Sequence, residues 1–278
     1  MHLAYTRFDP KDQNAGYDVA MARCPLVIGH GLFGSRGNWS GLARKFSLSR
    51  RVFVVDHRNH GDSPHCLSHT YQEMAGDLKS FIDDVVEEPA IVLGHSMGGK
   101  AAMGCAVLYP ESVRSLIVCD IAPVDYAEAN DGMQEVLKSI AAVQENLVQE
   151  GFVVTRHKVD EIFALNKLSK PVRQFLLKSL IFDNSKIRWQ FNAETLVRSW
   201  DFIRGFPWDA CNFSYSGSVL VMRGGLSSYV NDKGLEMAKE FFHAAHVVTL
   251  PNAGHWLHAD AQEEFFSSVH DWLGEMQI

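Results

Sequence analysis

One pentapeptide has the residue types and spacing of a serine nucleophile. Residues 94–98 (GHSMG) match G-x-S-x-G, with an apolar run before them and a stretch of helical character after them. A serine on a sharp strand-to-helix turn presents its hydroxyl outward, and glycine neighbours let other backbone approach closely. Free N–H groups at the start of the helix point to the same place, where a developing oxyanion would lie. The pattern predicts acyl transfer with Ser96 as the nucleophile.

The candidate general base is His255. A serine hydroxyl is a weak nucleophile at neutral pH and needs a base beside it. His255 follows the last predicted strand, residues 246–250, and a glycine precedes it directly. Its loop is therefore expected at the same edge of the sheet as Ser96. The chain has 13 histidines, and His255 alone combines these two features.

Two aspartates compete for the role of the acid that orients His255. Asp120 ends the predicted strand 115–119, next to the strand that leads into Ser96. The other usual place is the loop after strand 218–222, but there Ser228 stands where an aspartate is expected, and Asp232 lies further along. A carboxylate at the end of a strand can reach the far imidazole nitrogen and hold its tautomer. We favour Asp120 and keep Asp232 as the alternative.

The oxyanion hole needs a second N–H donor beside that of Met97, the residue after the candidate nucleophile. Residues 30–35 (HGLFGS) follow the predicted strand 26–28 and have the position of the second oxyanion loop. We expect the backbone N–H of Leu32 to pair with that of Met97, and Phe33 is the alternative to Leu32.

The elements that position these residues alternate along the first part of the chain. Helical apolar spacing lies between the short apolar runs, and Thr70 with Glu73 forms a capping box at the start of one helix. The predicted strands are residues 26–28, 51–55, 90–93, 115–119, 218–222 and 246–250. Alternation of this kind predicts an α/β fold with a mostly parallel central sheet and helices on both faces.

The alternation stops in the middle of the chain. Between residues 124 and 216 we find helical spacing and no clear strand; the third of the helices expected there starts near Pro171 and includes Leu180. We therefore expect a helical lid over residues 124–216. The remaining chain, residues 1–123 and 217–278, is expected to form a hydrolase core in two parts.

Five motifs occur in a family-specific order along almost the whole chain. They are residues 30–35 (HGLFGS), 56–63 (DHRNHGDS), 94–99 (GHSMGG), 120–126 (DIAPVDY) and 254–256 (GHW). With them the chain resembles the YbfF-like esterases of bacteria and their mitochondrial abhydrolase-domain relatives, within the α/β-hydrolase superfamily. The resemblance implies that fold, with a helical lid inserted after the sixth strand, and carboxylesterase or acyl-thioester hydrolase activity. It also implies an acid after the sixth strand, which favours Asp120.

Composition argues against several other classes. The formal net charge is −7 and there is no stripe of Lys and Arg, so we expect no nucleic-acid partner. No apolar run approaches the roughly 20 residues that span a bilayer. The first residues lack the apolar segment of a signal peptide, and the five scattered cysteines are typical of free thiols in a reducing compartment. We expect a cytoplasmic protein of unspecified oligomeric state.

Three other motifs match their sequence patterns only in part. Residues 29–34 fit the glycine pattern of a dinucleotide site, but no helix starts within the glycines. Residues 94–100 nearly fit a phosphate-binding loop, but Ala101 stands where a magnesium-binding hydroxyl is needed. His57, His60 and His65 lack surrounding carboxylates or cysteines, so they are expected to order a loop. We expect neither a cofactor nor a metal.

Together these features predict a serine carboxylesterase or acyl-thioester (acyl-CoA) hydrolase, class EC 3.1. Its substrate is expected to be a small-molecule ester or acyl-CoA, cleaved through an acyl-enzyme by Ser96, His255 and Asp120. Two alternatives stay open. One is a C–C bond hydrolase or lyase on the same fold, and the other is a non-catalytic ligand-binding protein of that fold.

Overall fold

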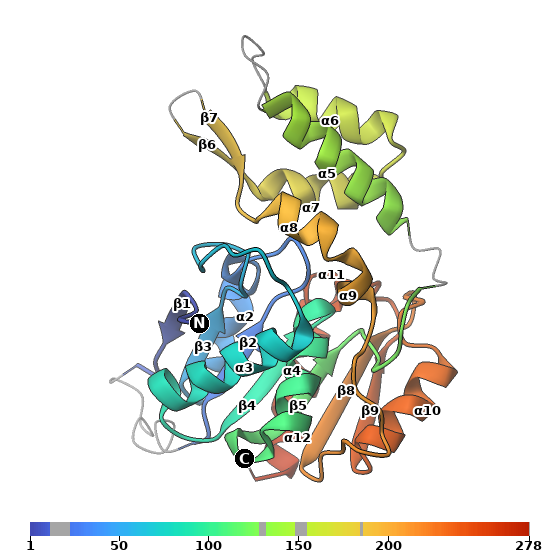
Figure 1. The fold of residues 1–278 in the computed structure, drawn as a ribbon. Helices are drawn as coiled ribbons and strands as arrows, with labels where there is room; N and C mark the ends of the chain where they lie inside the picture. The colour runs from blue at the N-terminus through green and yellow to red at the C-terminus, as the bar shows by residue number, and fades with distance from the viewer. Residues whose placement is uncertain (12–22, 128–131, 148–154, 184–185, 278) are drawn as a thin grey trace.

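A seven-stranded sheet forms the centre of the molecule (Figure 1). The computed structural model describes residues 1–11, 23–127, 132–147, 155–183 and 186–277. The strand order is β1-β3-β2-β4-β5-β8-β9. β1 (Tyr5–Phe8) is antiparallel to β3, and all other neighbours in the sheet are parallel. The predicted mostly parallel sheet is confirmed, with β1 as an additional edge strand that the sequence did not predict.

The parallel strands are β2 (Leu26–Gly29), β3 (Val52–Val55), β4 (Ala90–His95), β5 (Val113–Cys119), β8 (Ser218–Gly224) and β9 (Ala245–Leu250). Every residue of β2, β3 and β4 is buried. Their side chains alternate between two cores: Val92 faces one, and Ile91 and Leu93 face the other. Burial on both faces explains why these strands are continuous apolar runs in the sequence.

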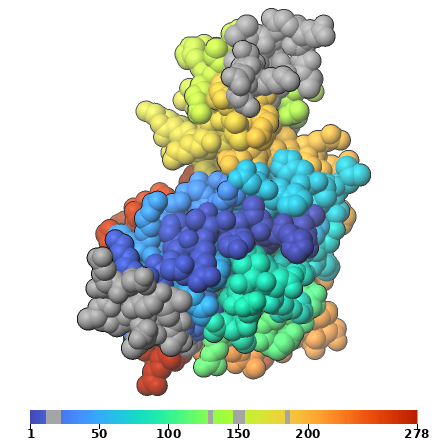
Figure 2. All heavy atoms as spheres, turned by 90° about the vertical axis from the view of Figure 1, so that its left-hand side faces the viewer, coloured from blue at the N-terminus to red at the C-terminus, as the bar shows by residue number. Residues whose placement is uncertain are grey.

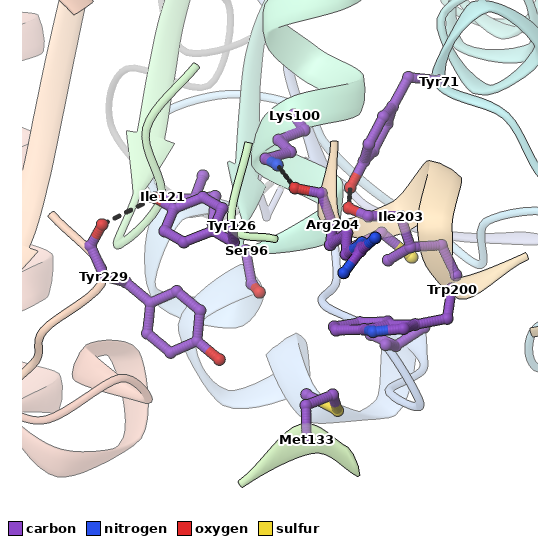
Figure 3. Close-up of a pocket in the computed structure, with 12 residues that line it drawn as sticks. Tyr71, Ser96, Lys100, Ile121, Tyr126, Met133, Trp200, Ile203, Arg204 and Tyr229 are labelled. Carbon is purple, nitrogen blue, oxygen red and sulfur yellow. Dashed lines mark hydrogen bonds between the residues drawn. The ribbon is translucent and has the colours of Figure 1, made fainter. Parts of the chain in front are cut away.

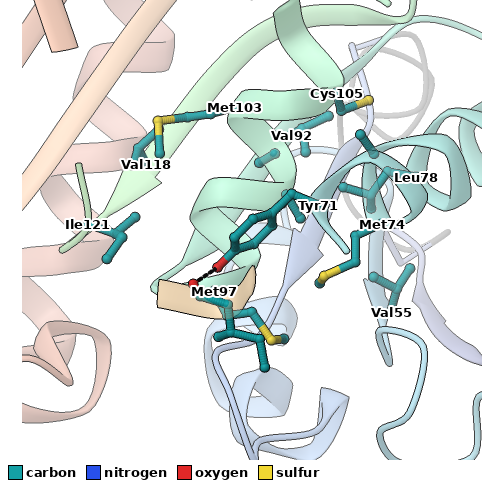
Figure 4. Packing of buried hydrophobic residues seen from close by; sticks show 14 of the residues in the cluster. Val55, Tyr71, Met74, Leu78, Val92, Met97, Met103, Cys105, Val118 and Ile121 are labelled. Carbon is teal, nitrogen blue, oxygen red and sulfur yellow. Dashed lines mark hydrogen bonds between the residues drawn. The ribbon is translucent and has the colours of Figure 1, made fainter. Parts of the chain in front are cut away.

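Helices cover both faces of the sheet. Residues of α3 (Tyr71–Phe81), α4 (Met97–Leu108) and α10 (Asp232–Phe241) belong to one core, and those of α2 (Ser40–Phe46) and α12 (Gln262–Glu275) belong to the other. Figure 4 shows Tyr71, Met74 and Leu78 of α3 beside the sheet and α4. The short helices are η1 (Arg36–Trp39), η2 (Ile82–Val86), η3 (Pro110–Ser112) and α11 (Leu257–Asp260). The predicted capping box at Thr70 and Glu73 is present.

Between β5 and β8 the chain leaves the sheet, and we call residues 124–216 the insert. Its helices are α5 (Met133–Leu147), α6 (Arg156–Leu165), α7 (Lys170–Lys178), α8 (Ala193–Arg198) and α9 (Trp200–Arg204). The insert stands over one end of the sheet and is narrower than the body below it (Figures 1 and 2). Ser179 Oγ, just after α7, donates to Phe33 O at 2.8 Å, so the insert contacts the loop after β2 directly.

One expectation for the insert was wrong. It contains a hairpin of β6 (Leu180–Asp183) and β7 (Lys186–Trp189), where no strand was predicted. Leu180, expected in the third helix of the insert, is instead the first residue of β6, because α7 ends at Lys178. Strands of four residues are too short to show a clear alternation of polar and apolar side chains.

None of the described helices is both long enough and apolar enough to cross a bilayer.

Candidate active site

Ser96 lies on a strained turn between β4 and α4. Its backbone has φ 52° and ψ −120°, a left-handed conformation that costs an L-residue free energy. A Cβ on Gly94 would collide with the carbonyl of Gly98, and one on Gly98 would collide with backbone of the loop after β2. Only glycine fits at either position, so the G-x-S-x-G spacing is a packing requirement of this turn.

Asp120 follows β5 directly and is fully buried. One carboxylate oxygen, Oδ1, accepts the backbone N–H of Gly224 at 2.9 Å. The other oxygen, Oδ2, accepts His255 Nδ1–H at 2.8 Å and the hydroxyl of Ser227. These bonds leave the second ring nitrogen of His255 as the one with a free lone pair.

The alternative acid, Asp232, lies elsewhere. It is the first residue of α10, and its side chain is 98% exposed, at 3.8 Å from the Arg223 guanidinium. The structure therefore brings His255 together with Asp120, and the loop after β8 contributes a serine hydroxyl instead of a carboxylate.

His255 is held from two sides. Its ring stacks on Tyr229 with centroids 4.1 Å apart, and its backbone carbonyl accepts His95 Nε2–H at 2.8 Å. Burial, together with the neighbouring His258 and His255, holds the pKa of His95 well below its usual range. His95 is thus a neutral donor that fixes the loop carrying His255.

The loop after β2 passes directly against Ser96. A Cβ on Gly31 would lie 3.3 Å from the Ser96 Cβ. The Phe33 N–H donates to His60 Nε2 at 3.1 Å, and His60 Nδ1–H donates to Arg58 O at 3.0 Å. Because His60 already binds the Phe33 amide, this geometry favours Leu32 over Phe33 as the second oxyanion donor. His60, from the predicted loop-ordering group, orders this loop.

A pocket opens beside Ser96, with about 370 Å³ of space not filled by atoms, open solvent included. In Figure 3 the Ser96 hydroxyl points into the space bounded by Met133, Trp200 and Tyr229. The wall is mostly apolar, and the Tyr71 hydroxyl in it donates to Ile203 O at 2.6 Å. The lining residues are Leu32, Tyr71, Ser96, Met97, Lys100, Ile121, Tyr126, Met133, Trp200, Ile203, Arg204 and Tyr229.

Comparison with known proteins places the chain in a family. Residues 25–262 match the family model described as alpha/beta hydrolase fold. The chain belongs to the alpha/beta hydrolase family. It is 36% identical to the sn-1-specific diacylglycerol lipase ABHD11 of Mus musculus, over 89% of this chain and 80% of that protein. It is 33% identical to Esterase YbfF of Escherichia coli K12, over 90% and 93%.

A solved structure agrees with these relatives. The marine microorganism esterase has a TM-score of 0.85 to this chain at 31% identity, covering 98% of this chain and 99% of its own. The predicted resemblance to YbfF-like and abhydrolase-domain proteins is thus confirmed. Relatives of this kind support a hydrolase of the alpha/beta type.

Within this hydrolase fold, sequence reasoning missed several residues around the site. Ser227 is adjacent to Ser228, at which the acid was sought, and the serine doublet in that loop was the available signal. Tyr126 Oη accepts the Ala122 N–H at 3.0 Å and donates to Tyr229 O at 2.7 Å, which ties the loops after β5 and β8 together. Tyr126 belongs to the recognised motif DIAPVDY, but its role depends on a contact distant in sequence.

Proposed function

We propose that the protein is a serine carboxylesterase or acyl-thioester hydrolase, class EC 3.1. Ser96 Oγ attacks the acyl carbonyl while His255 Nε2 takes its proton, and Asp120 holds the Nδ1–H tautomer and stabilises the imidazolium. The N–H groups of Leu32 and Met97 bind the oxyanion. Water, activated by the same His255, then releases the acyl group from Ser96.

One observation carries this proposal. The hydrogen bond of 2.8 Å between His255 Nδ1 and the buried Asp120 Oδ2 lies at the sheet edge where Ser96 projects from its strained turn. A base oriented by a buried carboxylate beside a nucleophile turn is the arrangement that activates a serine. Two of the relatives named above are an esterase and a lipase, which agrees with this chemistry.

The insert is proposed to act as the lid, residues 124–216, over a hydrolase core of residues 1–123 and 217–278. Met133, Trp200 and Ile203 bring apolar surface from the insert to the pocket beside Ser96. Apolar walls favour a hydrocarbon acyl group. Small-molecule esters and acyl-CoA thioesters are therefore the proposed substrates, and the name of the mouse relative adds glycerol esters to the series worth testing.

The test combines covalent labelling with a substrate series. A fluorophosphonate probe should label the wild-type protein and not Ser96→Ala. p-Nitrophenyl esters, acyl-CoA thioesters and a diacylglycerol should then rank ester against thioester. A labelled wild-type protein that turns over none of them would contradict the esterase proposal and favour the C–C hydrolase alternative. Equal labelling of wild type and Ser96→Ala would contradict the nucleophile.

A further inference from the structure

Lys100 is a buried lysine that the proposed reaction does not use. It lies on α4, one turn after Ser96, and is 1% exposed. Its backbone N–H donates to Ser96 O at 3.1 Å, within the turn that carries the candidate nucleophile. Any group that the Lys100 side chain holds is therefore positioned relative to Ser96 through a few backbone bonds.

The ammonium group binds two segments of the insert that are distant in sequence. Nζ donates to Val124 O at 2.9 Å, where the chain enters the insert, and to Arg204 O and Gly205 O at 2.7 Å, where α9 ends. The two backbone segments also contact each other, since Tyr126 N donates to Arg204 O at 3.1 Å. An ammonium has three N–H donors, and here all three bind carbonyls. Lys100 lines the pocket but has no donor left for a substrate.

The surroundings of this cation contain little that neutralises it. Within the part of the chain that the structure describes, no carboxylate lies at ion-pair distance from Lys100 Nζ; the charge of Asp125 acts on it from further away. The nitrogen lies over the ring of Tyr126 at 4.7 Å and that of Tyr71 at 5.7 Å. The guanidinium of Arg204 is directed to Asp201.

Burial of such a charge is costly, and it lowers the pKa of Lys100 to about 7. An apolar side chain would avoid that cost but would remove the Nζ donor from all three carbonyls, of which Arg204 O would keep the Tyr126 N–H. The contribution of Lys100 to the structure is therefore its three hydrogen bonds to the insert.

The backbone held by Lys100 carries one wall of the pocket. Arg204 carries one of the clamped carbonyls, Ile203 precedes it directly, and both residues line the pocket. Tyr126, two residues after Val124, lines it as well. Displacing these segments would move the wall that a long acyl chain must contact. An acetyl group reaches little beyond Ser96 and the oxyanion donors, so it would not contact this wall.

We propose that Lys100 is a positioning residue that clamps the start of the insert and the end of α9 to the nucleophile helix and so sets the preference for long acyl groups. The acyl-preference part of this inference rests on the proposed esterase function. The clamping part concerns the backbone and does not depend on it.

The test compares Lys100→Met with Met103→Ala, which removes a comparably buried side chain from the same helix and none of the bonds to the insert. kcat/KM is measured for p-nitrophenyl octanoate and acetate, per active site titrated with fluorophosphonate. In Lys100→Met the octanoate-to-acetate ratio should fall about tenfold through a higher KM for octanoate. Met103→Ala should lose stability and keep the ratio. An unchanged ratio in Lys100→Met, or an equal fall in both variants, would overturn the proposal.

Two further readouts keep the inference testable if the enzyme is inactive or the variant folds poorly. Amide hydrogen exchange at Tyr126 should be faster in Lys100→Met than in Met103→Ala, whatever the substrate; equal exchange would overturn the clamp. In the wild type, the acyl ratio should fall as pH rises through about 7, because a neutral amine has two N–H groups for three carbonyls. Burial raises the pKa of Tyr71 and Tyr126, so neither titrates there. The ratio cancels any pH dependence of the chemical step that both substrates share. A pH-independent ratio would count against the proposal.

Discussion

The sheet body and the insert are built differently. In the body, nearly every residue of α4 is buried, and Phe33, Ser96 and Asp120 are all held at positive φ. In the insert, α6 buries only Val159 and Phe163 along its length. Strained backbone persists only where surrounding packing over-determines it. The body can therefore hold reacting groups in a fixed geometry, whereas the insert supplies side chains to the wall of the pocket.

The candidate reacting groups accordingly come from the body, and much of the pocket wall comes from the insert. Changes in the body should therefore affect the rate of the chemical step. Changes in the insert should affect the binding of the acyl group. Each variant below tests one side of this division.

The largest effect is expected from Ser96→Ala. Without the attacking oxygen, kcat should fall by about 10⁴–10⁶-fold for every acyl length, as in other triad knockouts. Circular dichroism and thermal unfolding provide the control for folding. Residual turnover above one per cent of wild type would remove Ser96 from the mechanism.

Asp120→Asn should be next. The amide would favour the wrong tautomer of His255, so kcat should fall by about 10²–10⁴-fold with little change in KM. Asp232→Asn is the matched control, because that carboxylate is exposed on α10, and it should remain close to wild type. The reverse ranking in steady-state kinetics would move the acid to the loop after β8.

Ser227→Ala tests the hydroxyl that binds Asp120. Removing one hydrogen bond to a buried carboxylate costs about 1.5–3 kcal/mol, and part of it should appear as a decrease in kcat of about tenfold. Ser228→Ala is the neighbouring control and should leave kcat unchanged. Equal kinetics of the two variants would show that the Ser227 bond does not support His255.

Trp200→Ala tests the insert. Losing about 40 Å² of apolar contact with a long acyl chain costs about 1 kcal/mol, so KM for an octanoate ester should rise about fivefold. The kcat for acetate should stay at the wild-type value, because the chemical step is built on the body. A fall in kcat for both esters would break the proposed division between the two regions.

The last prediction concerns the acid stability of the body and not its catalysis. His258 stacks on Trp39 with centroids 4.3 Å apart, and burial lowers its pKa to about 3. As pH falls below the ordinary value of about 6.5, the unfolded chain binds this proton and the folded chain does not. His258 therefore costs about 1.4 kcal/mol of stability per pH unit between those values. Between pH 8 and pH 5, His258→Phe should therefore lose about 2 kcal/mol less unfolding free energy than the wild type, as measured by denaturant unfolding. An identical loss in the two proteins would contradict the prediction.

Much of the body could be predicted from the sequence, because its signals are local. Continuous apolar runs indicate parallel strands, and the carboxyl ends of such strands meet at one edge. That rule, with the family resemblance, favoured Asp120 over Asp232 as the partner of His255, and the structure has Asp120 there. The capping box at Thr70 similarly depends on neighbouring residues only.

What could not be predicted depends on contacts between distant segments. Ser227, Tyr126 and Lys100 are ordinary polar residues until the fold brings them to a carboxylate or a carbonyl. In the insert, the four-residue strands β6 and β7 stabilise each other and carry little signal alone. Helical periodicity identified the helices there, but it contains no information on which side chains reach the pocket.

The hydrogen bond between Tyr126 N and Arg204 O has a consequence for exchange of modules. It joins backbone near the start of the insert to the end of α9, so residues 127–203 form a loop whose ends already touch. The entropy of closing a loop grows only slowly with its length. A longer or shorter segment from another hydrolase could therefore replace the chain between Tyr126 and Arg204 at little entropic cost. Substrate preference could then be exchanged between hydrolases by exchanging this segment, with the sheet body unchanged.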